Sequence, residues 1–292
     1  MVLYANLESY LLPQDASIHI SVQQVKVHGR GAILLTGPSS CGKGELATSL
    51  CGFLSLPEEH HISMGDVLRS TIQAARIDAT TRDMLRDQCG IDEQTSVLEP
   101  SRNSPELIAK VQRYLDGSEA APPSQLDWLE HCVTAGLLIP DDWAERIIEA
   151  QLRSNVAIHD SIFILDGYPR TRGAAESLLR LFNDLGIDVI KVLHLSINKA
   201  EMKSRAQGRG RPDDTDDALD LRYEFYIEHV QPCIDYLKEC LGTERVALVD
   251  AHQPAYATSG SLDLDRSIRA VTVSALEALG LPRYLLDLDE NT

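Results

Sequence analysis

Positive charge and long apolar runs are both scarce in this sequence. Its 292 residues hold 27 Lys and Arg against 44 Asp and Glu, which gives a formal net charge of −17. Nucleic-acid backbones and anionic membrane surfaces both require a cationic face, so binding to either is not expected. Residues 1–20 lack a basic start followed by an apolar stretch, and no apolar run is long enough to span a membrane. We therefore expect a soluble, non-secreted, cytoplasmic protein.

Paired cysteines and aromatic residues are also lacking. The 6 cysteines form no CxxC pair and show no Cys/His spacing typical of zinc ligands, so neither a structural zinc nor a disulfide framework is expected. Aromatic residues make up only 5% of the chain, which leaves the core to aliphatic and small side chains. The length still allows one large domain with an inserted subdomain, or two small domains.

A glycine-rich run follows the first strongly apolar segment. Residues 37–43 read GPSSCGK and fit the pattern GxxxxGK, after the apolar run 32–36 and before a helical pattern that begins near Leu46. Backbone N–H groups of such a loop point at phosphate oxygens, aided by the positive end of the helix dipole. An ordinary Gly-rich turn is the alternative interpretation. The pattern predicts a donor-phosphate site formed by Gly37, Ser39, Ser40, Cys41, Gly42, Lys43, Gly44 and Glu45.

Short apolar segments alternate with helical patterns along most of the chain. This alternation predicts a parallel sheet covered by helices on both faces. The expected strands are 32–36, 60–62, 162–165, 189–195 and 246–249.

Two other parts of the chain fall outside this alternation. Residues 70–162 are too many for a loop, so a subdomain is expected there, with helices at 105–115 and 126–135 joined by a linker at 117–124. Residues 1–29 are expected to form an N-terminal extension, with possible edge strands at 18–22 and 25–27.

Further motifs follow the glycine-rich loop in order. Residues 61–69 read HISMGDVLR, residues 166–170 read DGYPR, and residues 205–222 carry arginines around an RPDD sequence. With the loop, these resemble HxSxGDxLR, DG[FY]PR and R-x5-R-x-DD-x8-R of the adenylate kinase family of nucleoside monophosphate kinases. Residues 136–140, GLLIP, resemble the segment G-x-L-[VI]-P beside the acceptor base in that family. The resemblance spans roughly residues 31–250, apart from an apparent insertion at about 78–124.

The resemblance implies an architecture and a reaction. The fold would be an α/β P-loop NTPase-type three-layer sandwich with a parallel five-stranded sheet, and the kinase core would span residues 30–292. An enlarged NMP-binding subdomain with the insertion would lie at about 63–140, and a short lid at about 205–215. The implied reaction is transfer of the γ-phosphoryl group of ATP, with Mg²⁺, to a nucleoside monophosphate, AMP being favoured, by a monomeric enzyme.

Arginines suit this reaction because guanidinium groups bind phosphate oxygens bidentately and stay charged. By motif position, Arg69 and Arg170 would hold the acceptor phosphate, and Arg205 and Arg211 would reach the donor phosphates from the lid. Asp166 would bind Mg²⁺ through water. The expected catalytic residues, with Arg222 near the transferring group and Asp213 orienting the closed lid, are Lys43, Arg170, Arg205, Arg211, Asp213 and Arg222. The expected acceptor-binding residues are Ser63, Met64, Arg69, Ile139, Gly167, Arg170 and Ala174.

Four positions depart from the family's pattern. Glu45 stands where the family has a threonine that contacts a donor phosphate, and an ionised carboxylate cannot donate such a hydrogen bond. Ser40 replaces a loop glycine. Met64 and Ala174 replace the threonine and the glutamine that read adenine, and losing polar base-reading groups relaxes or changes base selection. We hypothesise that the acceptor need not be AMP.

Other interpretations stay open at this point. One is a P-loop kinase of a different phosphorylated small molecule or specialised metabolite. Another is a nucleotide-binding module with reduced catalysis, which Glu45 and the insertion favour. Among single residues, His61 is interpreted as structural rather than catalytic, and Cys41 as a small filler of the loop rather than a nucleophile. Residues 215–241 are interpreted as a helix packed on the core.

Overall fold

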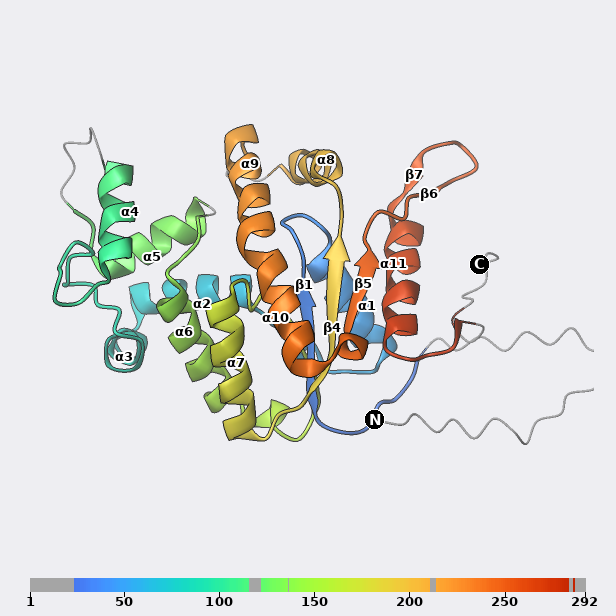
Figure 1. Ribbon diagram of the computed structural model, residues 1–292, viewed down its shortest axis with the longest axis horizontal. Coiled ribbons are helices and arrows are strands. Elements are labelled where there is room, and N and C mark those ends of the chain that lie inside the picture. The colour runs from blue at the N-terminus through green and yellow to red at the C-terminus, as the bar shows by residue number, and fades with distance from the viewer. Residues whose placement is uncertain (1–23, 116–121, 136, 211–213, 284–285, 287–292) are drawn as a thin grey trace, which may run out of the picture.

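A sheet of five parallel strands, in the order β2-β3-β1-β4-β5, forms the centre of the molecule (Figure 1). The computed structural model describes residues 24–115, 122–135, 137–210, 214–283 and 286. Its main strands are β1 (Gly31–Thr36), β2 (His61–Ser63), β3 (Ile162–Asp166), β4 (Val189–Ser196) and β5 (Val246–Asp250). Every residue of β1 is buried, because this strand lies in the middle of the sheet and both of its faces are covered. The predicted parallel sheet is confirmed.

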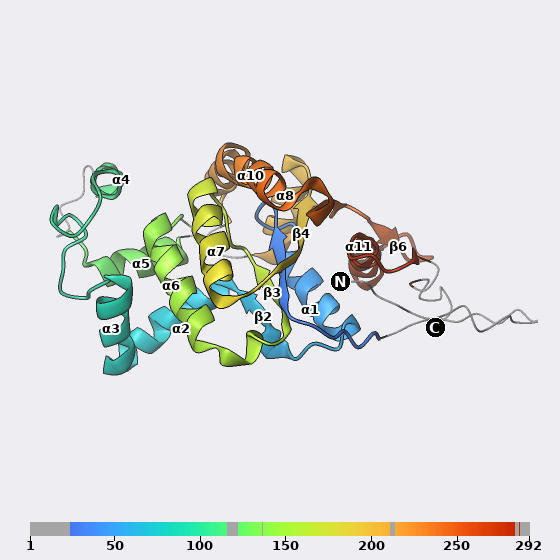
Figure 2. The same ribbon diagram turned by 60° about the horizontal axis from the view of Figure 1, so that its bottom comes forward.

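Helices cover both faces of the sheet, because side chains alternate between the faces along each strand. Ile33 and Leu35 of β1 pack in a cluster with α1 (Lys43–Phe53) and α11 (Leu264–Ala278). Ala32 and Leu34 pack on the opposite face with α7 (Arg172–Leu185) and α10 (Gln231–Leu241). Figures 1 and 2 show β1 and β4 between these two pairs of helices. The arrangement is the expected P-loop NTPase-type three-layer sandwich.

The segment between β2 and β3 is helical and shares the core of the sheet. Leu85, Ile91, Val97 and Val111 from the insertion are buried in one cluster with Leu34 of β1. The insertion is therefore an integral part of this segment. Helix α4 (Pro105–Leu115) within the insertion and α5 (Gln125–Thr134) after it match the helices predicted at 105–115 and 126–135. The elements are α2 (Met64–Ile77), α3 (Ala79–Met84), a π-helical turn (Leu85–Cys89), α4 (Pro105–Leu115), α5 (Gln125–Thr134) and α6 (Asp141–Ser154).

A long helical segment and a C-terminal unit complete the fold. After α8 (Lys199–Arg209), a continuous run joins α9 (Asp216–Phe225), a π-helical turn (Tyr226–Val230) and α10, which confirms the helix expected at 215–241. Beyond β5, the sequence pattern predicts neither the hairpin of β6 (Ala255–Tyr256) and β7 (Leu262–Asp263) nor α11. Single 3-10 turns lie at Glu58–His60, Val156–Ile158 and Thr243–Arg245.

Two of the expected strands need correction. His60 ends a 3-10 turn, so β2 begins one residue later than expected. Residues 25–27 form no strand. The Val25 N–H instead donates to the Phe53 carbonyl at 2.7 Å, and Val25 and Val27 pack against the cluster around α1. A backbone bonded to the end of a helix in this way is not bonded to a sheet edge. The segment 18–22 lies outside the described residues.

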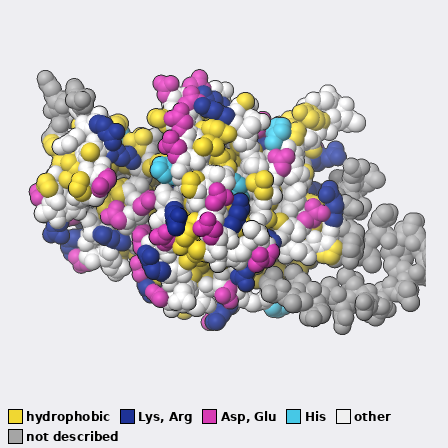
Figure 3. All heavy atoms as spheres, in the orientation of Figure 1, with side chains coloured by type: hydrophobic (Ala, Val, Ile, Leu, Met, Phe, Trp, Pro, Cys, Tyr) yellow, Lys and Arg dark blue, Asp and Glu magenta, His cyan; other side chains and the backbone are white. Residues whose placement is uncertain are grey.

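Acidic and basic side chains are interspersed over the face shown in Figure 3. No continuous basic surface is visible on that face, in line with the net charge of −17. Within the described ranges, no helix has the length and apolar character needed to cross a membrane.

Candidate functional site

The glycine-rich loop joins β1 to α1 and leaves the N-terminus of α1 open. Gly37 has a φ of 141°, and a Cβ atom there would lie 2.5 Å from the Leu195 carbonyl oxygen of β4. Gly42 precedes α1 with a φ of 90°, and no side chain caps the helix. Ser40 adopts a φ of 56°, so this non-glycine residue also turns left-handed. Backbone N–H groups at the uncapped helix end are available to an anion. Ser39 and Gly44, which also belong to the expected phosphate site, are half-buried.

Lys43, the first residue of α1, places its ammonium group inside the loop. Its Nζ donates to the carbonyls of Pro38 at 2.8 Å and Gly37 at 3.2 Å, and lies 3.6 Å from Sγ of Cys41. Cys41 is buried, and this burial raises the pKa of its thiol. The thiol therefore stays protonated and fills space, while Lys43 supplies positive charge to the loop.

Glu45 and Arg205 both face the start of α1. A Cβ atom added at Gly42 would lie 3.9 Å from Nη1 of Arg205 and 3.9 Å from Oε2 of Glu45. Arg205 lies on α8, and two hydrogen bonds fix its side chain. Its Nε donates to Glu201 of the same helix at 2.6 Å, and its Nη2 donates to the Ala251 carbonyl after β5 at 2.8 Å. The loop thus has a positive and a negative side chain at its mouth, and Glu45 opposes any phosphate that Arg205 attracts.

Asp166, at the carboxyl end of β3, is the candidate magnesium residue. Its Oδ2 lies 3.7 Å from Nε2 of His61, and its Oδ1 is buried without a hydrogen-bond partner among the described residues. An unpartnered carboxylate oxygen fits a water-held Mg²⁺, because Mg²⁺ keeps several waters and takes one or two carboxylates. The described residues contain no group of three or more His, Cys, Asp or Glu able to hold a metal. Water and substrate phosphates would therefore supply the other ligands.

Met64, Gly167 and Arg170 come together beside Asp166. The Nε of Arg170 donates to the Gly167 carbonyl at 2.8 Å, and a Cβ at Gly167 would lie 3.3 Å from Arg170 Nη2 and 3.9 Å from Met64 Cβ. Met64 and Ala174 are 3% and 2% exposed and belong to one apolar cluster, against which the half-buried Ile139 packs. Apolar side chains thus stand where the family's polar base-readers are expected.

The HISMGDVLR motif begins at the same edge of the sheet. Ser63 pairs in register with Asp166, so the carboxyl ends of β2 and β3 lie side by side. The Ser63 hydroxyl accepts a hydrogen bond from the Asp66 N–H and caps α2. Arg69, an exposed residue one turn further along α2, is paired with Asp66. Parallel strands have their carboxyl ends at the same edge of a sheet, so motifs that follow different strands lie close together there.

The lid arginines are only partly described. Nη1 of Arg222 pairs with Oδ1 of Asp214 at 2.8 Å, and their side chains are 15% and 2% exposed. Arg211 and Asp213 lie outside the described residues. Arg222, in the last turn of α9, is thus paired with a carboxylate that precedes this helix and is mostly buried. The sequence motif alone did not indicate this contact of Asp214, although the residue stands within the quoted lid motif.

A buried histidine beneath the loop was also missed. His194 on β4 pairs in register with Thr36, the last residue of β1, and its Nε2 lies 2.8 Å from the Tyr226 hydroxyl. Burial lowers the pKa of His194 to about 4, so the ring is neutral near pH 7. The contact ties β4 to the π-helical turn that follows α9. A lone histidine inside the apolar run 189–195 was the available signal.

Replacing His194 with glutamine is expected to flatten the acid side of the stability profile. Between about pH 6.5 and about pH 4, the unfolded chain binds a proton at His194 that the folded protein excludes. The free energy of unfolding therefore falls by about 3 kcal/mol as pH drops through this window, and His194 contributes no pH dependence above it. Urea unfolding near pH 7 and near pH 4.5 measures the free energy of unfolding of the wild type and of His194→Gln. If the difference in unfolding free energy between the two proteins is the same at both pH values, the His194 ring is not buried in its neutral form.

Comparison with known proteins adds evidence from the chain as a whole. The family model for adenylate kinase matches residues 124–241, which run from the start of α5 to the end of α10. The adenylate kinase of Mycobacterium tuberculosis (strain ATCC 25618 / H37Rv) is 28% identical over 211 residues, covering 72% of this chain and 88% of that protein. That of Mycobacterium sp. (strain MCS) is 29% identical over 248 residues, covering 85% and 98%. The adenylate kinase of Nocardia farcinica (strain IFM 10152) is 28% identical over 204 residues, covering 70% and 84%.

These similarities extend over most of the chain and include the DGYPR motif at the end of β3 and the helices that follow it. The sheet order places that motif next to the glycine-rich loop and to β2, so the three segments meet at one edge of the sheet. Over most of its length, the chain is therefore similar to adenylate kinases.

Proposed function

We propose that this protein transfers the γ-phosphoryl group of ATP to a nucleoside monophosphate, with AMP as the favoured acceptor. Its similarity to adenylate kinases supports an ATP-dependent phosphotransferase of the nucleoside monophosphate kinase class. The observation that carries the proposal for this chain is the ammonium group of Lys43, held by two loop carbonyls at an uncapped helix N-terminus. A fixed cation at that position neutralises charge on a transferred phosphoryl group.

The chemistry requires positioning and charge neutralisation rather than a covalent enzyme intermediate. An oxygen of the acceptor phosphate forms a bond to the γ-phosphorus as the bond from that phosphorus to the β,γ-bridging oxygen breaks, and ADP leaves. The acceptor phosphate is anionic near pH 7, so no general base is needed. Lys43 and Arg205 serve the donor side, and Arg69 and Arg170 serve the acceptor side. Arg211 would reach the donor phosphates from the lid, Asp213 would orient the closed lid, and Arg222 would lie near the transferring group.

Magnesium has a defined place in this scheme. When bound, Mg²⁺ would neutralise charge on the donor phosphates, held through water by Asp166. The buried, unpartnered Oδ1 of Asp166 supports that assignment. His61 lies 3.7 Å from this carboxylate and has no assigned part in the transfer.

Base selection is expected to be weaker than a polar pocket would give. A site that hydrogen-bonds a base rejects a wrong one by about 10⁴-fold or more, whereas an apolar pocket discriminates by about 100-fold. With buried Met64 and Ala174, we expect the kcat/KM for AMP to exceed that for GMP, CMP and UMP by no more than about 100-fold. An assay of ADP formation over a panel of ribo- and deoxynucleoside monophosphates measures these ratios.

Met64→Thr is the matched variant for this panel, because it restores a polar group at a position bordering Arg170 through Gly167. The AMP preference should rise in the variant while the KM for ATP stays unchanged. An AMP preference in the wild type as strong as a polar site would give contradicts the relaxed selection.

Glu45 supports a second candidate, a nucleotide-binding module with reduced catalysis, because its carboxylate lies at the donor loop. Calorimetric titration with ATP, combined with the acceptor panel, separates the two candidates. Binding of ATP without phosphoryl transfer to any acceptor in the panel would favour the module. ADP release with a different phosphorylated metabolite alone would favour a specialised small-molecule kinase.

A further inference from the structure

The inserted helix α4 touches the backbone of the segment that joins α5 to α6. Nζ of Lys110 donates a hydrogen bond to the Leu138 carbonyl at 2.7 Å, although the two residues come from different elements. Leu138 directly precedes Ile139, one of the proposed acceptor-binding residues, and Pro140 follows as the N-cap residue of α6. The insertion is therefore joined to the segment 137–140, which contains Ile139, by a charge-assisted hydrogen bond.

Lys110 reaches this carbonyl from a well-anchored helix. Leu107 and Val111, its neighbours on α4, are 6% and 0% exposed and belong to the main core cluster. One turn further on, the Tyr114 ring packs 5.4 Å from Trp128 and 4.7 Å from His131 of α5, measured between ring centroids. Fixing a long lysine side chain costs rotamer entropy, so its half-buried ammonium must gain from the bond.

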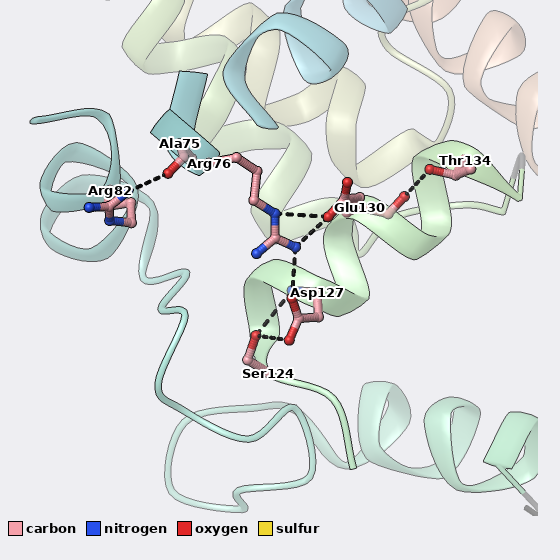
Figure 4. Close-up of polar contacts among 7 residues, drawn as sticks. All are labelled: Ala75, Arg76, Arg82, Ser124, Asp127, Glu130 and Thr134. Atoms are coloured by element: carbon pink, nitrogen blue, oxygen red, sulfur yellow. Dashed lines mark hydrogen bonds and ion pairs between the residues drawn. The ribbon is translucent and has the colours of Figure 1, made fainter. Parts of the chain in front are cut away.

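The same unit is connected to the start of the acceptor site. Figure 4 shows Arg76 of α2 lying between Asp127 and Glu130 of α5. The Nη2 atom of Arg76 lies 2.7 Å from Asp127 Oδ1, and its Nε lies 2.9 Å from Glu130 Oε2. Helix α2 also carries Arg69. The contacts among α2, α4 and α5 therefore fix the position of Arg69 relative to the segment 137–140.

We propose that Lys110, supplied by the insertion, is a positioning residue for the nucleoside monophosphate acceptor. Lys110 binds the Leu138 carbonyl oxygen and so fixes the orientation of the peptide group between Leu138 and Ile139. This orientation presents Ile139 to the acceptor. The proposal rests on the phosphotransferase function stated above. It assigns the insertion a role in acceptor affinity and none in donor affinity.

The test compares Lys110→Met with the wild type. Arg113→Met is the matched control, because Arg113 is an exposed cation on the same helix whose side chain donates only to Ala109 of its own helix among the bonds identified. Lys110→Arg keeps a cationic donor and serves as the rescue. Each protein is titrated calorimetrically with AMP and, separately, with ATP, and its KM values for both are measured with ADP formation.

We expect Lys110→Met to weaken AMP binding and raise the KM for AMP by about tenfold. The affinity for ATP should stay unchanged and kcat should change by less than twofold. Lys110→Arg should recover most of the loss, and Arg113→Met should match the wild type. Amide hydrogen exchange at residues 137–139 should quicken in Lys110→Met alone.

Three results would overturn the proposal. The first is an unchanged AMP affinity in Lys110→Met, and the second is an equal loss of ATP affinity, which indicates general disruption of the fold. The third is absence of AMP binding to the wild type. Failure of the proposed function looks different: the wild type binds AMP, and Lys110→Met weakens that binding, but no acceptor is phosphorylated.

Discussion

Lys43→Met is expected to reduce kcat for phosphoryl transfer by about 1,000-fold while the protein stays folded. The ammonium of Lys43 is the cation that the structure fixes inside the loop, on the carbonyls of Gly37 and Pro38. Methionine keeps the length and apolar stem of the side chain but removes the charge, so the transition state loses its neutralising partner. Initial rates with saturating ATP and AMP measure the effect, and thermal unfolding checks the fold.

Lys238→Met is the control for this loss of one positive charge. Lys238 lies on α10, where it pairs with Asp235 at 3.2 Å on the surface, away from the loop in the sequence. We expect the control to retain the rate of the wild type. A Lys43→Met enzyme that keeps more than about one tenth of the activity would show that Lys43 has no direct part in transfer.

Gly37→Ala is expected to destabilise the loop by about 3 kcal/mol and to abolish tight ATP binding. Gly37 adopts a φ of 141°, a conformation that side-chain-bearing residues rarely take. The new Cβ would also lie 2.5 Å from the Leu195 carbonyl oxygen and 3.1 Å from Cys41 Sγ. The first of these atoms is sheet backbone and cannot move aside without disturbing β4, so the loop must move instead.

Urea unfolding and ATP titration measure the two parts of this prediction. Gly52→Ala provides the matched control, because Gly52 lies within α1 and an added Cβ there meets nothing within 4 Å. This control should keep ATP affinity and gain up to about 1 kcal/mol of stability, since alanine favours a helix over glycine. Equal stability of the Gly37→Ala and Gly52→Ala proteins would contradict the strain at Gly37.

Local pattern was enough to predict the central elements. The run 32–36 predicts the buried strand β1, and the glycine spacing after it predicts an open helix N-terminus with Lys43 beside it. Strand burial, loop conformation and helix start each depend on residues within a few positions, so the sequence carries them directly. The apolar run 162–165 likewise predicts the strand β3 (Ile162–Asp166).

Contacts between distant segments were not predictable in the same way. Nothing local indicates that Glu45 and Arg205 both lie beside Gly42, that His61 meets Asp166, or that Tyr226 meets His194. The same holds for α11, whose packing on α1 completes one face of the sheet.

The sequence by itself determined the kind of protein: an acidic α/β chain with a phosphate-binding loop, and arginine motifs in the order of a known kinase family. Only the tertiary structure decided which side chains share the site, because that depends on the order β2-β3-β1-β4-β5 and on parallel strands ending at one edge. It also decided what the insertion does. Its apolar residues join the main core, and its Lys110 reaches the Leu138 carbonyl, a backbone atom that no side-chain pattern can specify.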